Sequence, residues 1–270
     1  MTKDIDSLFD QALICLKLAE PELKVAATLA LQESWMKQGL KTKSSQPVVP
    51  LLTPGRPDKP DLVDPKEVPR RRFNSLKGRL TLVHAIAHIE FNAINLALDA
   101  VYRFQHMPEQ YYTDWCLVAA EEAQHFTMLS NYLQSHGVAY GDLPAHNGLW
   151  EMAVKTDADV LVRMALVPRV LEARGLDVTP GMINKLQSTG DIQLISILQK
   201  IFDDEIGHVK IGSYWYQTLC KERNIESEKQ FLELIDKYMH GAKFGPFETE
   251  ARNKAGFSNE EMQSLLNRFS

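Results

Sequence analysis

Residues 118–126 read VAAEEAQHF, and residues 202–212 read FDDEIGHVKIG. Each stretch contains a Glu-x-x-His motif, Glu122 with His125 and Glu205 with His208, set among apolar residues that recur at helical spacing. Residues three apart on an α-helix lie on one face, so both polar members of each motif are expected to point into the core. The two motifs therefore predict helices that carry carboxylate and imidazole groups into a helical interior.

Two further glutamates interrupt apolar faces of predicted helices. Glu90 lies in the middle of the stripe Val83, Ile86, Ala87, Ala93, Ile94 and Ala97, and Glu172 follows Leu161, Ala165 and Pro168. Glu90 and Glu172 are 82 residues apart, while the two Glu-x-x-His motifs are 83 residues apart. The chain is therefore predicted to contain two helical hairpins with equivalent polar residues.

Buried carboxylates require compensation, because a charge without a partner is costly in an apolar interior. Two divalent cations would balance four glutamates, with two neutral imidazoles completing the ligand set. A Glu from two helices plus Glu-x-x-His from two others is the ligand pattern of di-iron and di-manganese bundles. The predicted metal ligands are Glu90, Glu122, His125, Glu172, Glu205 and His208. Fe/Fe, Mn/Fe and Mn/Mn pairs all suit these ligands, with iron expected first.

Helical periodicity dominates outside one segment, and it predicts an all-α fold. The expected helices span residues 6–19, 21–38, 75–105, 108–136, 149–174, 191–221 and 226–240. Seven prolines between positions 47 and 69 predict an extended, proline-rich strap. Gly175 and Pro180 place Glu172 near the end of its helix, in an interrupted or bent segment. The predicted organisation is an N-terminal helical hairpin (1–46), the strap (47–73), a four-helix bundle (74–221) and a C-terminal helical extension (222–270).

The composition excludes several classes of protein. A net charge of −5 and a pI near 5.9 give no broad attraction to nucleic acid or anionic lipid. The sequence contains neither a signal peptide nor a long apolar span, which predicts a cytoplasmic protein without a membrane partner. Cys15, Cys116 and Cys220 form no C-x-x-C pair, so a metal would be bound by nitrogen and oxygen.

Other polar residues have simpler interpretations than a second site. His84 and His88 share the face opposite Glu90, where a polar interhelix or surface role is favoured over zinc binding. Arg70, Arg71 and Arg72 could contact an anionic substrate or RNA, but salt bridges to nearby acids are the favoured interpretation. Asp204 and Glu121 each precede a motif and could accept the second imidazole proton of a ligand histidine, or be solvated acids on a helix flank.

Several of these stretches resemble one bacterial family. AHIEFNAINLALDAVYRF, YYTDWCLVAAEEAQHF, YGDLPAHNGLW, RMALVPRVLEARGLDVTP and DDEIGHVKIGSYW are similar to the ferritin-like proteins gathered as domain-of-unknown-function family 455. The resemblance runs from about residue 20 to residue 217. It implies a ferritin-like fold and the same six ligands, as in the wider superfamily of diiron tRNA hydroxylases, ribonucleotide reductase small subunits and rubrerythrins.

The leading functional hypothesis is an oxygen-dependent oxidase or hydroxylase of a small organic substrate. Glu122 and Glu205 are the candidates for carboxylates that change their binding mode, by analogy with the superfamily. The alternatives are a ferroxidase or peroxide-scavenging protein, which would need an external electron donor for peroxidase chemistry, and a non-catalytic helical binding module. A homodimer through an outer helix face would be ordinary for such a bundle.

Overall fold

The computed structural model describes residues 6–43, 47–69, 73–240 and 244–269. These residues are helical apart from loops and two isolated β-bridges, which confirms the predicted all-α class. The chain divides into two compact units, residues 1–155 and residues 156–270. None of the described helices is both long enough and apolar enough to cross a membrane. Arg70, Arg71 and Arg72 lie outside the described residues.

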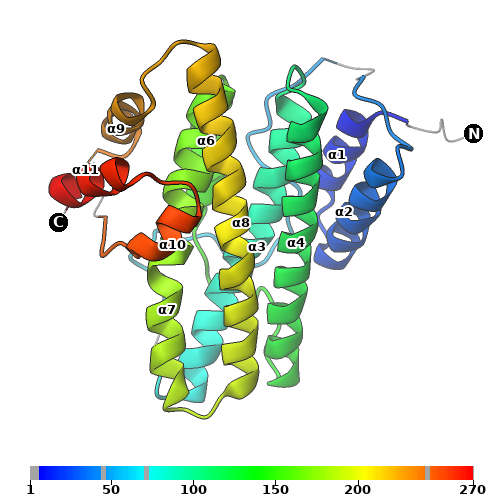
Figure 1. Cartoon of the computed structure of the whole chain (residues 1–270). Coiled ribbons are helices and arrows are strands. Elements are labelled where there is room, and N and C mark those ends of the chain that lie inside the picture. The colour runs from blue at the N-terminus through cyan, green and yellow to red at the C-terminus, as the bar shows by residue number, and fades with distance from the viewer. Residues whose placement is uncertain (1–5, 44–46, 70–72, 241–243, 270) are drawn as a thin grey trace, which may run out of the picture. The chain divides into compact units, whose positions relative to one another are not determined.

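The first unit is built on a long antiparallel helical pair (Figure 1). Helix α3 (Leu76–Arg103) begins at Ser75, whose hydroxyl accepts from the Gly78 amide, and it packs along α4 (Glu109–Ser135). Helix α1 (Leu8–Lys17) packs on α3, α2 (Pro21–Met36) packs on α4, and the short α5 (Gly148–Lys155) also contacts α3. These limits lie within two residues of the predicted ones for the first four helices.

A buried lysine joins the N-terminal hairpin to α3. The Lys24 ammonium group is 0% exposed and donates to the carbonyl oxygens of Cys15 and Leu16 at 3.0 and 2.9 Å, and to Asn95 Oδ1 at 2.7 Å. The Leu16 carbonyl also accepts from the Gly55 amide at 2.8 Å, so the strap is attached at the same point. One cation therefore holds the end of α1 against α2 and α3.

The strap lies along the loop that follows α4. Residues 61–63 form backbone hydrogen bonds with Ala145 at 2.8 and 3.0 Å. His84 Nε2 accepts from the Gly141 amide at 2.9 Å, and His88 Nδ1 lies 2.9 Å from the Tyr140 hydroxyl. The histidine face of α3 is therefore a buried polar contact with this loop. The surface alternative is wrong, because the loop covers both rings.

The second unit contains a helix with an internal change of winding. Helix α6 (Val160–Leu166) continues through a π-helical turn, η1 (Val167–Glu172), into α7 (Ala173–Gln187), and this continuous helix packs on α8 (Ile192–Glu222). Gly212 of α8 lies against Pro168 of η1, since a Cβ atom at position 212 would come within 2.3 Å of the proline ring. The absence of a side chain at Gly212 thus allows the two helices to approach closely.

The predicted helix at 149–174 begins within one residue of α5, but its continuity and its C-terminal end are wrong. A break at residues 156–159 separates α5 from α6, where the Asp159 carboxylate caps the new helix by accepting from the Leu161 amide at 2.9 Å. The helix then continues past Gly175 and Pro180 to Gln187. Burial of Ala173, Leu176 and Thr179 offsets the backbone hydrogen bond that Pro180 cannot donate. Glu172 is therefore not at a helix end, although the expectation of an interrupted segment is confirmed by the π-helical turn.

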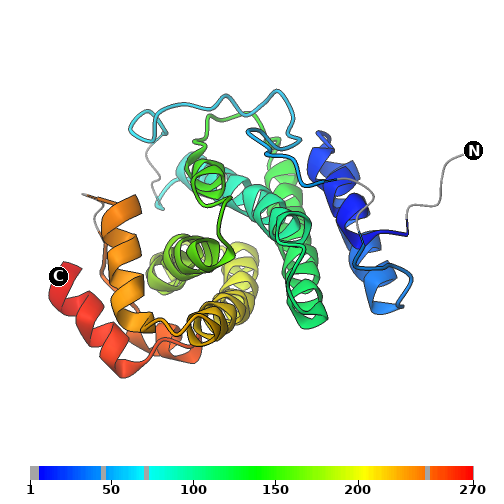
Figure 2. The same ribbon diagram turned by 90° about the horizontal axis from the view of Figure 1, so that it is seen from above.

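Three smaller helices complete the second unit (Figure 2). Helix α9 (Ser227–Tyr238) packs on α6 and α8, α10 (Thr249–Lys254) packs on α7 and α8, and α11 (Asn259–Phe269) packs on α10. Their buried apolar residues include Phe231, Phe257 and Met262. The described residues after α8 are therefore largely helical, and they cover the continuous α6–η1–α7 helix and α8.

The contact between Gly212 and Pro168 gives a first prediction. Gly212→Ala should lower the free energy of unfolding by about 1–3 kcal/mol, because the new methyl group must displace the proline ring. Gly207→Ala is the control on the same helix, since a Cβ atom there meets nothing within 4 Å and should stabilise the helix by about 0.5–1 kcal/mol. Urea unfolding in a chelating buffer measures both. Equal effects of the two variants would contradict the close approach.

Lys24 predicts a pH dependence of stability. Burial lowers the pKa of Lys24 to about 7 from an ordinary value of 10.5. The unfolded chain then binds more protons than the folded one above pH 7, so the free energy of unfolding should rise between pH 7 and 8.5. Lys24→Met should remove this rise in urea unfolding experiments. Equal slopes in the two proteins would show that the three oxygen partners keep the ammonium group charged.

Candidate metal centre

The first unit brings three of the six predicted ligands together in its interior. Glu90 comes from the middle of α3, and Glu122 and His125 lie one turn apart on α4. His125 Nδ1 is 3.2 Å from Glu90 Oε2 and 3.4 Å from Glu122 Oε2. Each residue offers one ligand atom, and these atoms lie within 4.8 Å of one another. This buried cluster of Glu and His could bind a metal ion.

Burial sets the electrostatics of the cluster. The side chains of Glu122, His125 and Glu90 are 0%, 1% and 4% exposed. Burial, reinforced by the charge of Glu122, raises the pKa of Glu90 well above its usual range. Burial alone would lower the pKa of His125, but its hydrogen bonds to Glu122 and Glu90 outweigh this effect and raise the pKa to about 11.

These shifts indicate what the cluster needs. When two carboxylates are excluded from water, their ionised forms are costly unless a positive charge lies beside them. Such carboxylates are therefore either protonated or paired with a protonated imidazole. A divalent cation would replace those protons and leave the imidazole neutral, which is the form in which histidine binds metals. The cluster is thus suited to a cation, and its oxygen and nitrogen donors suit iron and manganese.

The second unit repeats the Glu-x-x-His arrangement on α8. Glu205 and His208 are 8% and 0% exposed, and His208 Nδ1 lies 3.5 Å from Glu205 Oε1. Glu172 is the last residue of η1, which packs directly on α8, and its side chain is half-buried. The second unit therefore carries the other three predicted ligands on two helices that are in contact.

The two helix-flank acids differ in their surroundings. Asp204 forms an ion pair with Lys200, one turn earlier on α8, and its side chain is 17% exposed. Glu121 is half-buried on α4. A role for either carboxylate in orienting a ligand histidine stays a prediction.

His84 and His88 are engaged by the loop rather than arranged as a second metal site. Burial lowers the pKa of both to about 4, so both rings are neutral. The His88 ring also contacts the His146 carbonyl oxygen at 3.2 Å, and Asn92 Nδ2 lies 3.1 Å from His88 Nε2. The ring nitrogens are thus used in holding the loop, which favours a polar packing role over zinc binding, although the partner is a loop and not a second helix.

A buried arginine lies close to one predicted ligand, and sequence reasoning did not identify its partner. Arg169 lies in η1, three residues before Glu172, and is 0% exposed. Its partner is Glu261, 92 residues later in the chain. The S-x-x-E pattern at 258–261, typical of a helix N-terminus, was the readable signal at the Glu261 end.

Comparison with known proteins places the chain in a family. The chain is 43% identical over 272 residues to an uncharacterized protein of Haemophilus influenzae, and the alignment covers 97% of this chain and 94% of that protein. No solved structure matches the chain. Residues 17–263 match the family described as "Protein of unknown function (DUF455)". Because this match spans most of the sequence, the chain belongs to the DUF455 family.

Proposed function

We propose that the protein binds two transition-metal ions, iron first, and uses them to oxidise or hydroxylate a small organic substrate with oxygen. The proposed ligands are Glu90, Glu122, His125, Glu172, Glu205 and His208. The helices that carry them, α3, α4, α6–η1–α7 and α8, would form a ferritin-like four-helix bundle. The single observation that carries this proposal is the buried cluster of Glu90, Glu122 and His125.

The charge of this cluster supports a metal more than a purely structural role. A structural core would favour apolar side chains, because replacing buried ionic groups with apolar ones is often neutral or stabilising. Here two glutamates are buried beside one histidine, and the same motif recurs on α8. The recurrence of Glu-x-x-His on α4 and α8 is explained if both motifs bind metal ions.

When bound by these residues, a pair of iron ions would supply the electrons that reduce oxygen. The chain's own residues would hold the ions at fixed positions and keep water away from them. The apolar residues around the first cluster include Ile94, Val118 and Phe126, each at most 3% exposed. Such surroundings strengthen the electrostatic interactions of the ligands and limit side reactions.

The elements outside the four proposed bundle helices favour an organic substrate over iron storage. Helices α1 and α2, the strap and the C-terminal helices are not required for a minimal bundle. Backbone hydrogen bonds attach the strap to Leu16 and Ala145, so the strap is an integral part of the first unit. Covering or shaping a substrate pocket is a use for such elements.

Metal binding should be linked to stability. In a chelating buffer the unfolding free energies of the wild type and of Glu122→Gln set the metal-free reference for each protein. With Co(II) present at about a hundred times its Kd, the wild type should gain about 2.7 kcal/mol of unfolding free energy, and Glu122→Gln should gain much less. Glu109→Gln is the control, since Glu109 is exposed on the same helix. A wild type that gains nothing from Co(II), Fe(II) or Mn(II) would contradict the proposal.

Metal content and oxygen reactivity test the reaction class. Protein purified without added metal should contain about two metal ions per chain by mass spectrometry, and Glu122→Ala and His208→Ala should lose them. After anaerobic Fe(II) loading, oxygen should produce a single turnover in the absence of an organic substrate. Repeated turnover of Fe(II) would instead indicate a ferroxidase, and protein without metal or oxidation would leave the binding-module hypothesis.

A further inference from the structure

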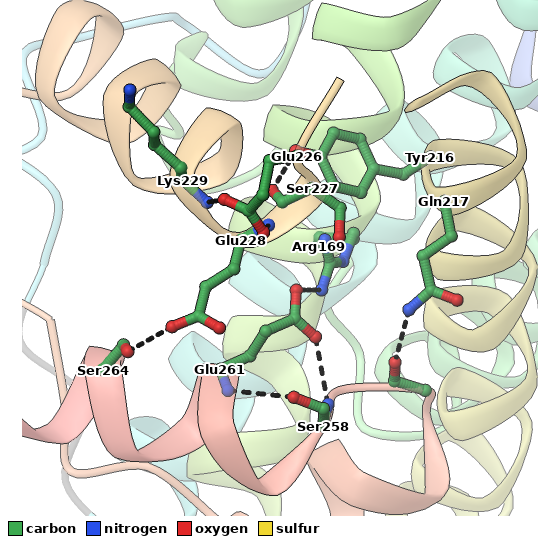
Figure 3. Close-up of polar contacts among 11 residues, drawn as sticks. Arg169, Tyr216, Gln217, Glu226, Ser227, Glu228, Lys229, Ser258, Glu261 and Ser264 are labelled. Atoms are coloured by element: carbon green, nitrogen blue, oxygen red, sulfur yellow. Dashed lines mark hydrogen bonds and ion pairs between the residues drawn. The ribbon is translucent and has the colours of Figure 1, made fainter. Parts of the chain in front are cut away.

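A buried arginine anchors the π-helical turn that ends at Glu172. Arg169 Nη2 donates to Glu261 Oε1 at 2.7 Å (Figure 3). The guanidinium carbon also lies 4.3–4.7 Å from the ring centroids of three aromatic residues, Tyr216, Phe231 and Phe257. These rings come from α8, α9 and the turn after α10. One side chain of η1 thus contacts every part of the second unit that surrounds it.

The environment of Arg169 is specific for arginine. Among the described residues, Nε and Nη1 have no hydrogen-bond partner, so the π faces of the rings replace further acceptors. A planar guanidinium can stack on rings while donating to a carboxylate, whereas a lysine ammonium group cannot reproduce both contacts.

The carboxylate that receives Arg169 is itself held in place. Glu261 Oε2 accepts from the Ser258 amide at 3.0 Å, and Ser258 Oγ accepts from the Glu261 amide at 3.0 Å (Figure 3). This reciprocal pair is a capping box at the start of α11. Ser264 of α11 also bonds to Glu228 of α9, and Gln217 of α8 donates to the Gly256 carbonyl oxygen at 3.1 Å. The carboxylate that accepts from Arg169 is therefore also held by the backbone at the start of α11.

A second buried ion pair holds the same helix beyond Glu172. Asp177 of α7 accepts from Arg252 of α10 through both of its oxygens, each at 2.8 Å. It also accepts from the Glu248 amide at 3.0 Å. Glu172 lies between the two anchored positions, three residues after Arg169 and five before Asp177.

A π-helical turn is uncommon and needs support from its surroundings, and such turns frequently occur at functional sites. On one side of η1, Pro168 packs against Gly212. On the other side, Arg169 contacts the C-terminal helices through its ion pair with Glu261. The direction in which Glu172 leaves the helix depends on the winding of η1. Whatever holds η1 therefore fixes the backbone from which this side chain extends.

We infer that residues 248–269 form a brace that orients Glu172, with Arg169 as the positioning residue through its buried ion pair with Glu261. This inference rests on the proposed function, in which Glu172 is a metal ligand. The helices of the C-terminal extension would then support the metal centre without contributing a ligand to it.

The brace is tested with Arg169→Met and Glu261→Gln in the full chain. Each variant is titrated with Co(II) under anaerobic conditions, and binding is followed by the ligand-field absorption of the ion. Glu172→Gln is the reference variant, because it shows how much Co(II) affinity is lost when this one ligand is removed. We expect both variants to bind Co(II) on the order of tenfold more weakly and to shift the absorption band, because Glu172 is no longer held in one orientation. The double variant Arg169→Met/Glu261→Met, which leaves no buried unpaired charge, should recover stability but not Co(II) affinity.

Arg163→Met is the matched control. Arg163 is a second buried arginine of the same continuous helix, and its Nε donates to Thr156 Oγ1 at 2.8 Å. This variant should lose stability but keep the affinity and absorption band of the wild type. Wild-type Co(II) binding in Arg169→Met, or equal losses in Arg163→Met, would overturn the brace while leaving the proposed function intact. A wild type that binds none of Co(II), Fe(II) and Mn(II) would overturn the proposed function and the brace together.

Discussion

Burial of the Glu90 and Glu122 carboxylates is the constraint on which the first unit depends. Both side chains lie in the interior of the α3–α4 pair, where ionised groups lose the solvation that water provides. Within this cluster His125 contributes one positive charge beside two carboxylates, and its pKa rises accordingly. The metal-free cluster thus holds protons that a cation could displace. Stability and metal binding are then expected to be coupled, since an ion bound by the folded state alone stabilises it.

The buried cations elsewhere in the molecule show a different arrangement. Lys24 is surrounded by three oxygen acceptors, Arg169 by a carboxylate and three rings, and Arg252 by both oxygens of Asp177. In each case the chain supplies the compensating groups itself, so the charge has a structural explanation. The cluster of Glu90, Glu122 and His125 instead brings three metal-ligand side chains within 4.8 Å of one another in the interior, which marks it as a candidate functional site.

Much of this architecture could be predicted from the sequence, because helix signals are local. Apolar periodicity placed α3, α4 and α8 within two residues of their observed limits, and the same periodicity identified Glu90, Glu122 and Glu205, which are buried. Features that depend on distant contacts were not predictable. The π-helical turn forms where Pro168 meets Gly212, and the α3 histidine face is buried because a loop more than 50 residues away covers it. Pro180 was read as a helix end, since sequence alone does not show the packing that offsets its missing donor.

The order of charges along the C-terminal extension specifies how it lies on the α6–η1–α7 helix. Arg169 pairs with Glu261 and Asp177 pairs with Arg252, so the later position on the helix meets the earlier position on the extension. The reversed alignment would bring Arg252 to Arg169 and Glu261 to Asp177, and like charges buried together cost several kcal/mol. Phe257 lies between the two arginines, 4.4 Å from one guanidinium and 5.0 Å from the other, which ties the two pairs into one unit. Ordering a terminal segment costs about 1–2 kcal/mol per residue in backbone entropy. Burial of Phe257, Met262 and Leu265 opposes that cost, while the alternating charges select a single alignment and therefore a single environment for the turn that ends at Glu172.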